Sequence, residues 1–278
     1  MWSQEQPRAA QHVSVGDCLI LVEEVVRYRD SERGRVKKVL RVFLGLLIVG
    51  LCGFGAWVAI TSVGLPDVAN LRESISSELA ARGSAYVPLD RVPPGQLSSL
   101  VAVEDKRFYE HHGIDWIRVG GALWANAKAR HVVQGASTIT EQLVDNTLLR
   151  DEEKGLARKV RAILLSRRVE QAYTKDQILE LYLNAIYYGP GSYGIEAASG
   201  NYFGRLPSDL DQEQQLFLAG VIRGPALYDP YWHCPATRGR IDEVIAARLE
   251  ASSLSRTEAE ALRAAPLVYT HGVCQAQD

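Results

Sequence analysis

The sequence lacks the patterns that build metal sites and nucleotide sites. Its 278 residues include four cysteines, and none lies in a Cys-x-x-Cys or Cys-x-x-His spacing, so nothing indicates a zinc site. It has no Gly-x-x-x-x-Gly-Lys-Ser/Thr loop of the kind that cradles nucleotide phosphates. Internal repeats and low-complexity segments are also absent. With 47% hydrophobic residues and a net charge of −2, the composition is that of a folded protein.

Charge is missing from one segment altogether. From Val42 to Pro66 the stretch VFLGLLIVGLCGFGAWVAITSVGLP holds no Asp, Glu, Lys or Arg, and as a helix it would span ~30 Å of hydrocarbon. We therefore predict a transmembrane helix over 42–65. A cleaved signal peptide is disfavoured because the run starts late and has no small-residue cleavage pattern behind it. A buried core helix is the other alternative, but such a helix usually carries a polar stripe.

The flanks of this segment predict its orientation. RGRVKKVLR (33–41) is basic and holds no acid, whereas the far side opens with Asp67. Because positive flanks stay inside, residues 1–41 are expected to be a cytoplasmic tail and 67–278 a domain outside the membrane. Cys234 and Cys274 both lie in that outer domain, where oxidation is feasible. Whether they form a disulfide is left open.

Helical patterning dominates the outer domain. Apolar residues recur at helical spacing over 68–83, over 95–113 with a stop at Gly113, over 155–173 and over 174–189. Thr174 is placed as an N-cap, and Gly189 as a C-terminal stop. The fold class we predict is mainly α.

The segment GASTITEQLVDN (135–146) places Glu141 and Asp145 one turn apart on the same helix face. Like charges at this spacing destabilise a helix by roughly 0.2–0.5 kcal/mol. They are either a solvated surface or part of a site. Ser137 and Thr138 stand at the start of that helix, where they either cap it or bind an anion.

Two further segments carry candidate chemistry. LVAVEDKRFYEHHG ends an apolar helix with Glu104, and a carboxylate beside apolar and aromatic groups can act as an acid or base near neutral pH. A solvated helix end is the alternative. LARKVR brings together Arg158 and Lys159, which form either a solvated basic face or a phosphate clamp.

The order of these segments carries more information than any one of them. EDKRFYEHHG, GASTITEQ, RKVRA, TKDQILELYLN and YGPGSYGIEAAS follow one another within 85–250. In this order they resemble the peptidoglycan glycosyltransferases of the lysozyme-like transglycosylase family. No Ser-x-x-Lys occurs in the sequence, so the resemblance is to the monofunctional form, without a penicillin-binding transpeptidase domain.

The resemblance implies a lysozyme-like glycosyltransferase domain on a single membrane helix, in the periplasm of a bacterium. Its substrate would be lipid II, which is added to a nascent glycan strand with inversion and release of undecaprenyl pyrophosphate. Membrane lipid and other cell-wall synthesis proteins are the remaining expected partners, and no nucleic acid is expected. Glu104 matches the catalytic base. The positions that match substrate-binding residues are Asp105, Phe108, His111, Gly113, Ser137, Thr138, Gln142, Asn146, Arg158 and Lys159. Those that match structural motif residues are Glu180, Tyr182, Asn184 and Gly194.

Three positions depart from the family pattern. Ala162 stands where the family has a second active-site Glu, Glu141 where it has Gln, and Asp145 where it has a phosphate-facing Lys. Either a divalent cation, Mg²⁺ or Mn²⁺, bridges the two acids to the pyrophosphate, or the site binds weakly. The alternative function is therefore a pseudoenzyme that binds glycan or lipid II as a scaffold. A lytic glycosidase is a more distant alternative.

One more segment bears on the membrane. In IDWIRVGGALWANAKAR (114–130), Trp116 and Trp124 lie among aliphatic residues and are followed by Lys128 and Arg130. This composition suits a surface that dips into the lipid interface. Packing of the same side chains in the protein core is the alternative.

Overall fold

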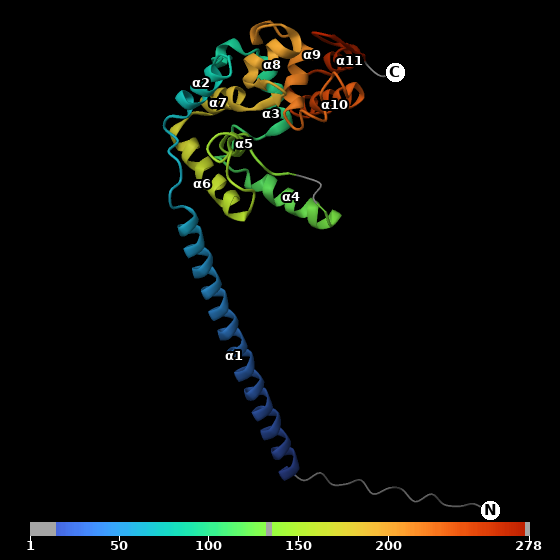
Figure 1. Cartoon of the computed structure of the whole chain (residues 1–278). Coiled ribbons are helices and arrows are strands. Elements are labelled where there is room, and N and C mark those ends of the chain that lie inside the picture. The colour runs from blue at the N-terminus through green and yellow to red at the C-terminus, as the bar shows by residue number, and fades with distance from the viewer. Residues whose placement is uncertain (1–14, 132–134, 276–278) are drawn as a thin grey trace, which may run out of the picture. The chain divides into compact units, whose positions relative to one another are not determined.

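The computed structural model describes the backbone of residues 15–131 and 135–275, and side chains at 37, 38 and from 40 onward within those ranges. The chain divides into two compact units, Met1–Ile60 and Thr61–Asp278. The helix α1 (Val15–Thr61) accounts for the described part of the first unit. The second unit holds, in chain order, α2 (Leu71–Ala81), η1 (Leu89–Arg91), α3 (Pro94–Glu104), α4 (Trp116–Ala129), α5 (Ile139–Asn146), α6 (Leu156–Ala172), α7 (Lys175–Ala185), β1 (Tyr187–Gly189), β2 (Ser192–Tyr193), α8 (Gly194–Phe203), η2 (Pro207–Asp209), α9 (Gln212–Val221), α10 (Cys234–Glu250), α11 (Arg256–Ala264), β3 (Leu267–Tyr269) and β4 (Gly272–Cys274) (Figure 1).

The apolar part of α1 runs from Leu40 to Thr61 and is the one described helix long and apolar enough to cross a membrane. None of it is buried, and side chains such as Phe43 and Ile60 are 63% and 71% exposed. Such a surface suits lipid rather than a protein core. The helix ends at Thr61, short of the predicted end at 65, and its backbone is helical from Val15 onward, without a break at 41. Residues 1–14 of the predicted tail lie outside the described residues.

The second unit is mainly helical, as predicted. Helices α3, α9 and α10 pack against one another, and α5 packs against both α6 and α7. They share one hydrophobic core, in which Leu100, Leu165, Leu179 and Phe217 are each at most 1% exposed. Helix α4 lies at the periphery of this unit (Figure 1).

The helix expected over 95–113 is wrong in its second half. Helix α3 ends at Glu104, and Asp105 leaves the helical conformation with φ −155° and ψ 75°. The Asp105 carboxylate accepts a hydrogen bond from the backbone N–H of Ile139 at 3.0 Å. This long-range contact stabilises a non-helical backbone at Asp105, although the apolar pattern continues past it. Glu104, which the sequence placed at the polar end of this helix, is therefore its last residue.

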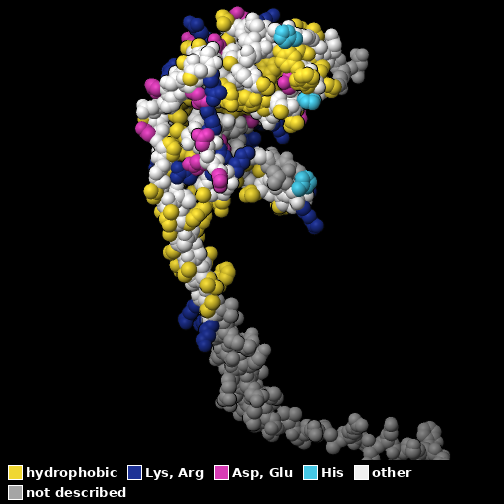
Figure 2. Space-filling view, viewed as in Figure 1, with side chains coloured by type: hydrophobic (Ala, Val, Ile, Leu, Met, Phe, Trp, Pro, Cys, Tyr) yellow, Lys and Arg dark blue, Asp and Glu magenta, His cyan; other side chains and the backbone are white. Residues whose placement is uncertain are grey.

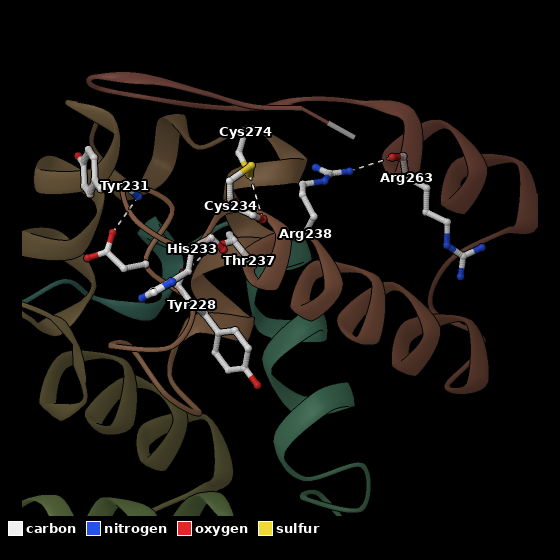
Figure 3. Close-up of a disulfide and its surroundings, with 9 residues drawn as sticks. Tyr228, Tyr231, His233, Cys234, Thr237, Arg238, Arg263 and Cys274 are labelled. Carbon is white, nitrogen blue, oxygen red and sulfur yellow. Dashed lines mark hydrogen bonds between the residues drawn. A yellow bond between two sulfur atoms is a disulfide. The ribbon is translucent and has the colours of Figure 1, made fainter. Parts of the chain in front are cut away.

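The C-terminal part is closed by a small hairpin. Strands β3 and β4 pair antiparallel, with Val268 opposite Val273. Cys274 at the end of β4 is bonded to Cys234 at the start of α10 as a disulfide (Figure 3). Arg238, one turn into α10, donates a hydrogen bond to the carbonyl of Arg263 in α11 at 2.8 Å. The hairpin and α11 are thus tied to α10.

Candidate active site

A cleft of about 580 Å³ opens where the C-terminal end of α3 meets the N-terminal ends of α4 and α5. Figure 2, in the view of Figure 1, shows the molecule hollowed between α4 and the helices above it. The wall of the cleft holds both signs of charge. Its charged and polar side chains include those of Glu104, Lys106, Arg118, Ser137, Gln142 and Arg223. Such a wall suits a polar ligand that carries negative charge.

Glu104 is fixed in this cleft by two side-chain donors. Its carboxylate accepts a hydrogen bond from Nε2 of Gln142 at 3.0 Å and lies 3.4 Å from Nη2 of Arg240. The side chain is 13% exposed. Arg118 of α4 donates to its backbone carbonyl. The carboxylate is therefore oriented by the protein and still reached from the cleft, as a general base must be.

Arg240 was not singled out in the sequence. It lies on α10 with 3% of its side chain exposed, donates to the carbonyl of Gly220 at 3.0 Å and pairs with Glu243 at 2.6 Å. A signal was available, because Arg240 falls one turn before the buried Val244 on the apolar face of its helix. A buried arginine is costly unless it is paired, so its position indicates a charged partner.

The remaining residues of the first motif lie behind Glu104. Asp105 is fully buried, and its Oδ2 contacts Nε2 of His111 at 2.9 Å as well as the backbone N–H of Ile139 at the start of α5. Phe108 is fully buried beneath the ammonium of Lys175, which lies 4.4 Å from the centre of its ring. These contacts hold the segment after α3 against the start of α5 and the start of α7. Direct substrate binding by Asp105, Phe108 and His111 stays a prediction.

Gly113 belongs to the same support. Its φ of +90° is in the left-handed region, and an added Cβ would lie 3.1 Å from the backbone of Ser166. Its carbonyl accepts a hydrogen bond from Oγ1 of Thr138 at 2.6 Å. A side chain at this position would therefore strain the backbone and push α6 away from the cleft.

The N-terminus of α5 is closed by its own side chains. Oγ1 of Thr138 accepts from the backbone N–H of Glu141 at 3.1 Å, and Oε2 of Glu141 accepts from the N–H of Thr138 at 3.2 Å. This is a capping box. Glu141 is 2% exposed. The solvated surface charge that the sequence offered as one alternative is therefore wrong for Glu141. The other alternative, that Glu141 is part of a site, stays a prediction, and Glu141 lines a second cavity of about 260 Å³ with Ser137 and Lys159.

Arg158 and Lys159, at the start of α6, form the basic motif of this chain. Glu141 and Asp145 each pair with one of them. Oε1 of Glu141 lies 2.9 Å from Nζ of Lys159, and Oδ1 of Asp145 lies 3.0 Å from Nη2 of Arg158. Lys159 also donates to Oγ of Ser137 at 3.3 Å. The two acids that looked mutually repulsive are therefore separately neutralised across the α5–α6 contact.

The third departure leaves no carboxylate on α6 at that position. Ala162 is fully buried and belongs to the hydrophobic core. Asn146, at the end of α5, donates from Nδ2 to the carbonyl of Gln142 at 2.7 Å. Within the described residues no group of three or more His, Cys, Asp or Glu side chains could hold a metal ion. The divalent cation stays a prediction.

The fourth of the five family segments, TKDQILELYLN on α7, holds the chain segment that precedes α3. Glu180 accepts from the hydroxyl of Tyr86 at 2.9 Å and from the N–H of Leu89 at 2.8 Å. Asn184 makes two bonds of 2.8 Å with the backbone of Val87, one to its N–H and one to its carbonyl. Tyr182, between them, donates to Oε1 of Gln142 at 2.8 Å and so reaches the cleft.

The fifth segment begins with a glycine that packing requires. Gly194 has φ +77°, and a Cβ there would lie 2.9 Å from the carbonyl oxygen of Asn184. The start of α8 is thereby held against the end of α7. The motif residues Glu180, Asn184 and Gly194 all make contacts within the fold.

Helix α4 exposes the apolar residues that the sequence assigned either to the lipid interface or to the protein core. Trp116, Ile117, Leu123 and Trp124 are 65%, 68%, 66% and 75% exposed. Core packing of these side chains is therefore wrong. The exposed apolar face begins next to Arg118 and Ile117, which line the cleft.

Comparison with known proteins identifies the family. The transglycosylase family profile matches residues 72–249. The chain is 41% identical over 216 residues to penicillin-binding protein 1A/1B of Bacillus subtilis, covering 73% of this chain and 24% of that protein. It is 40% identical over 212 residues to penicillin-binding protein 2D of Bacillus subtilis, covering 75% and 30%. It is 36% identical over 213 residues to penicillin-binding protein 1A of Escherichia coli, covering 72% and 25%.

The chain spans between a quarter and a third of the length of these relatives. The matched region includes the cleft and each of the motif residues around it. The resemblance read from the order of the motifs is thus confirmed, and the chain belongs to the transglycosylase family, with a domain related to the glycosyltransferase domains of penicillin-binding proteins.

Proposed function

We propose that residues 67–278 polymerise lipid II into β-1,4-linked glycan outside the bacterial cytoplasmic membrane, with Glu104 as the general base. The observation that carries this proposal is the position of Glu104. It ends α3 at the edge of the cleft, 13% exposed and held by Gln142 and Arg240. Family membership supports lipid II and glycan as the substrates.

The reaction needs a base, an acceptor and a stabilised leaving group. The 4-hydroxyl oxygen of the acceptor sugar attacks the anomeric carbon of the donor, and Glu104 takes the hydroxyl proton. The bond from that carbon to the pyrophosphate oxygen breaks, and its electron pair leaves with undecaprenyl pyrophosphate. Cations near the leaving group favour this step because they offset the charge it develops. Arg118, Arg223 and Lys106 line the cleft, and the basic pair of Arg158 and Lys159 adjoins it through the contact of Lys159 with Ser137. We assign the pyrophosphate to these cations.

A membrane-bound substrate also favours an anchored enzyme. The apolar part of α1 suits a single span, and the exposed apolar face of α4 suits contact with the lipid interface. The basic flank before the span supports an N-terminus inside and a cleft in the periplasm. Both features support an enzyme that stays at the membrane that carries its lipid-linked substrate.

A second function is favoured by two observations at the contact between α5 and α6. Ala162 is buried where the family has its second carboxylate, and the basic pair is engaged by Glu141 and Asp145. A pseudoenzyme that binds lipid II or glycan as a scaffold would keep the cleft without turnover. It would be expected to bind lipid II and yield no polymer.

Polymerisation of labelled lipid II by the detergent-solubilised full chain distinguishes the two functions. The enzyme yields glycan chains that lysozyme digests, whereas Glu104→Gln yields none. Parallel reactions with Mg²⁺, Mn²⁺ or a chelator test the predicted cation. Absence of product under every condition, with lipid II still bound, would establish the scaffold.

A further inference from the structure

Two acids that the sequence analysis reads as departures from the family pattern lie on the same helix, and each contacts a basic residue of the next helix. Glu141 and Asp145 belong to α5, and Lys159 and Arg158 belong to α6. The pairs are 2.9 and 3.0 Å long. The two anions offset the two cations, so the four side chains together carry no net charge.

We infer that Glu141 and Asp145 are built-in counter-anions of the basic motif, and that an anionic ligand binds Lys159 and Arg158 only in competition with them. The inference rests on the proposed function, because it concerns the pyrophosphate part of that site. Its consequence is a site with weak affinity for pyrophosphate, from which an anionic leaving group departs easily.

The two pairs are not equally open to competition. Lys159 is 46% exposed, and its ammonium is shared between the buried Glu141 and Ser137, which itself lines the cleft. A lysine ammonium has three N–H donors on a flexible stem. Lys159 can therefore turn from Glu141 toward a ligand beside Ser137 without disturbing the backbone.

Arg158 is held more firmly. Its side chain is 16% exposed, and besides Asp145 Oδ1 it donates to the backbone carbonyls of Asp145 and Leu149, both at 3.2 Å. These bonds tie the guanidinium to the C-terminal end of α5. These backbone bonds keep Arg158 in place when the Asp145 charge is removed. Asp145 therefore affects the electrostatic potential at the site more than it affects the position of Arg158.

Because Glu141 is buried, its carboxylate always competes with an anionic ligand for Lys159. Its carboxylate is 2% exposed and anchored at Oε2 by the capping box, so it cannot move into water when a ligand arrives. A ligand phosphate near Lys159 therefore meets a fixed negative charge. At an effective dielectric of about 20, a like unit charge some 8–10 Å away lowers affinity by a factor of about 15 to 30.

The structure offers a substitution that separates charge from shape. Because glutamine serves in a capping box as well as glutamate does, Glu141→Gln removes the negative charge and keeps the start of α5. Asp145→Asn removes the negative charge of the second pair and keeps the size of the side chain. Glu152→Gln is the matched control, since Glu152 pairs with Arg161 of the same helix at 3.0 Å and does not line the cleft.

The test measures binding of inorganic pyrophosphate to the detergent-solubilised full chain by calorimetry, without turnover. Glu141→Gln is expected to tighten binding at least about tenfold, by the loss of a nearby buried like charge. Asp145→Asn is expected to tighten it about threefold, because Asp145 is more exposed and its charge is more screened by solvent. Glu152→Gln is expected to change it less than twofold, as surface pairs contribute little. Lys159→Ala is expected to abolish the gain from Glu141→Gln. Thermal melting of each variant checks that it is folded.

Unchanged or weaker binding in both folded variants overturns the inference. If binding still depends on Lys159 in that case, the pyrophosphate site stands and only the counter-anion role is lost. If Lys159→Ala leaves pyrophosphate binding unchanged in wild type and in Glu141→Gln alike, or if no variant binds, the basic motif is not a pyrophosphate site. Lipid II polymerisation by the same preparations then shows whether the proposed function survives without it.

Discussion

Tyr182 links the fourth motif to the proposed base through one side chain. Its hydroxyl donates to Oε1 of Gln142, which leaves Nε2 of Gln142 to donate to Glu104. Burial, and then the charge of Glu104, raise the pKa of Tyr182 well above its ordinary value. The phenol therefore stays protonated and fixes which way the Gln142 amide points.

Tyr182→Phe is expected to lower the rate of lipid II polymerisation about tenfold, because a hydrogen bond in a network that ends on a charged group contributes about 1.5 kcal/mol. Tyr188→Phe is the control, since the Tyr188 hydroxyl is buried and has no hydrogen-bond partner. Rates at saturating lipid II distinguish the two variants. Equal rates in both would show that Gln142 needs no orientation by Tyr182.

Asp145 predicts a pH dependence of stability. Burial raises its pKa, while Arg158 and Lys159 lower it and Glu141 raises it, so that the pKa lies above its ordinary value. An acid whose folded pKa is raised binds its proton more tightly in the folded state, so its contribution to stability falls as pH rises through that range. Asp145→Asn is expected to stabilise the protein at pH 7, and this gain should shrink as the pH approaches 4, near the unfolded pKa of ~3.9. Chemical denaturation at both pH values measures it, and a gain that grows toward acid would contradict the sign.

Helix α4 exposes four large apolar side chains and is expected to contact lipid. In vesicles of brominated lipid, the intrinsic fluorescence of the full chain should be quenched, and Trp116→Phe with Trp124→Phe should remove a large part of that quenching. Trp232→Phe is the control, because Trp232 is 81% exposed and lies outside α4. Equal quenching in the double variant and in the control would place α4 in water.

Helices were predictable where one sequence pattern decides them. Thr174 caps α7 through a capping box with Gln177, as local chemistry predicts. The end of α3 was not predictable, because it depends on the bond from Ile139 to Asp105, a contact between residues far apart in sequence. The pairing of Glu141 with Lys159 needed the docking of α5 on α6. The sequence identified these charged residues, but it could not show whether Glu141 is repelled by Asp145 or neutralised by Lys159.

The disulfide acts on the whole outer unit because it closes a loop of 40 residues. In the chain-entropy description a loop of this length contributes roughly 4 kcal/mol. Cys274→Ser is expected to lower the melting temperature of the detergent-solubilised protein, and a reductant should lower that of wild type but not that of the variant. Cys52→Ser, at an exposed free cysteine of α1, is expected to have no effect. Identical melting of wild type with and without reductant would show that the bond is not formed.

At the scale of the whole molecule, the order of five segments was enough to identify the family, and the family profile matches 72–249. The matched region of 72–249 contains Glu104 as well as Ala162, Glu141 and Asp145. In the proposed reaction, Glu104 acts as the base without a second carboxylate at Ala162.

The initial rate of lipid II polymerisation by wild type, Glu104→Gln and Glu110→Gln tests the central claim most directly. Glu110 is an exposed acid that pairs with Arg107 and does not line the cleft. We predict polymer from wild type and from Glu110→Gln at similar rates, and a loss of at least about a hundredfold in Glu104→Gln, as expected when a general base is removed. Polymer made by Glu104→Gln at the wild-type rate would contradict the assignment of the base.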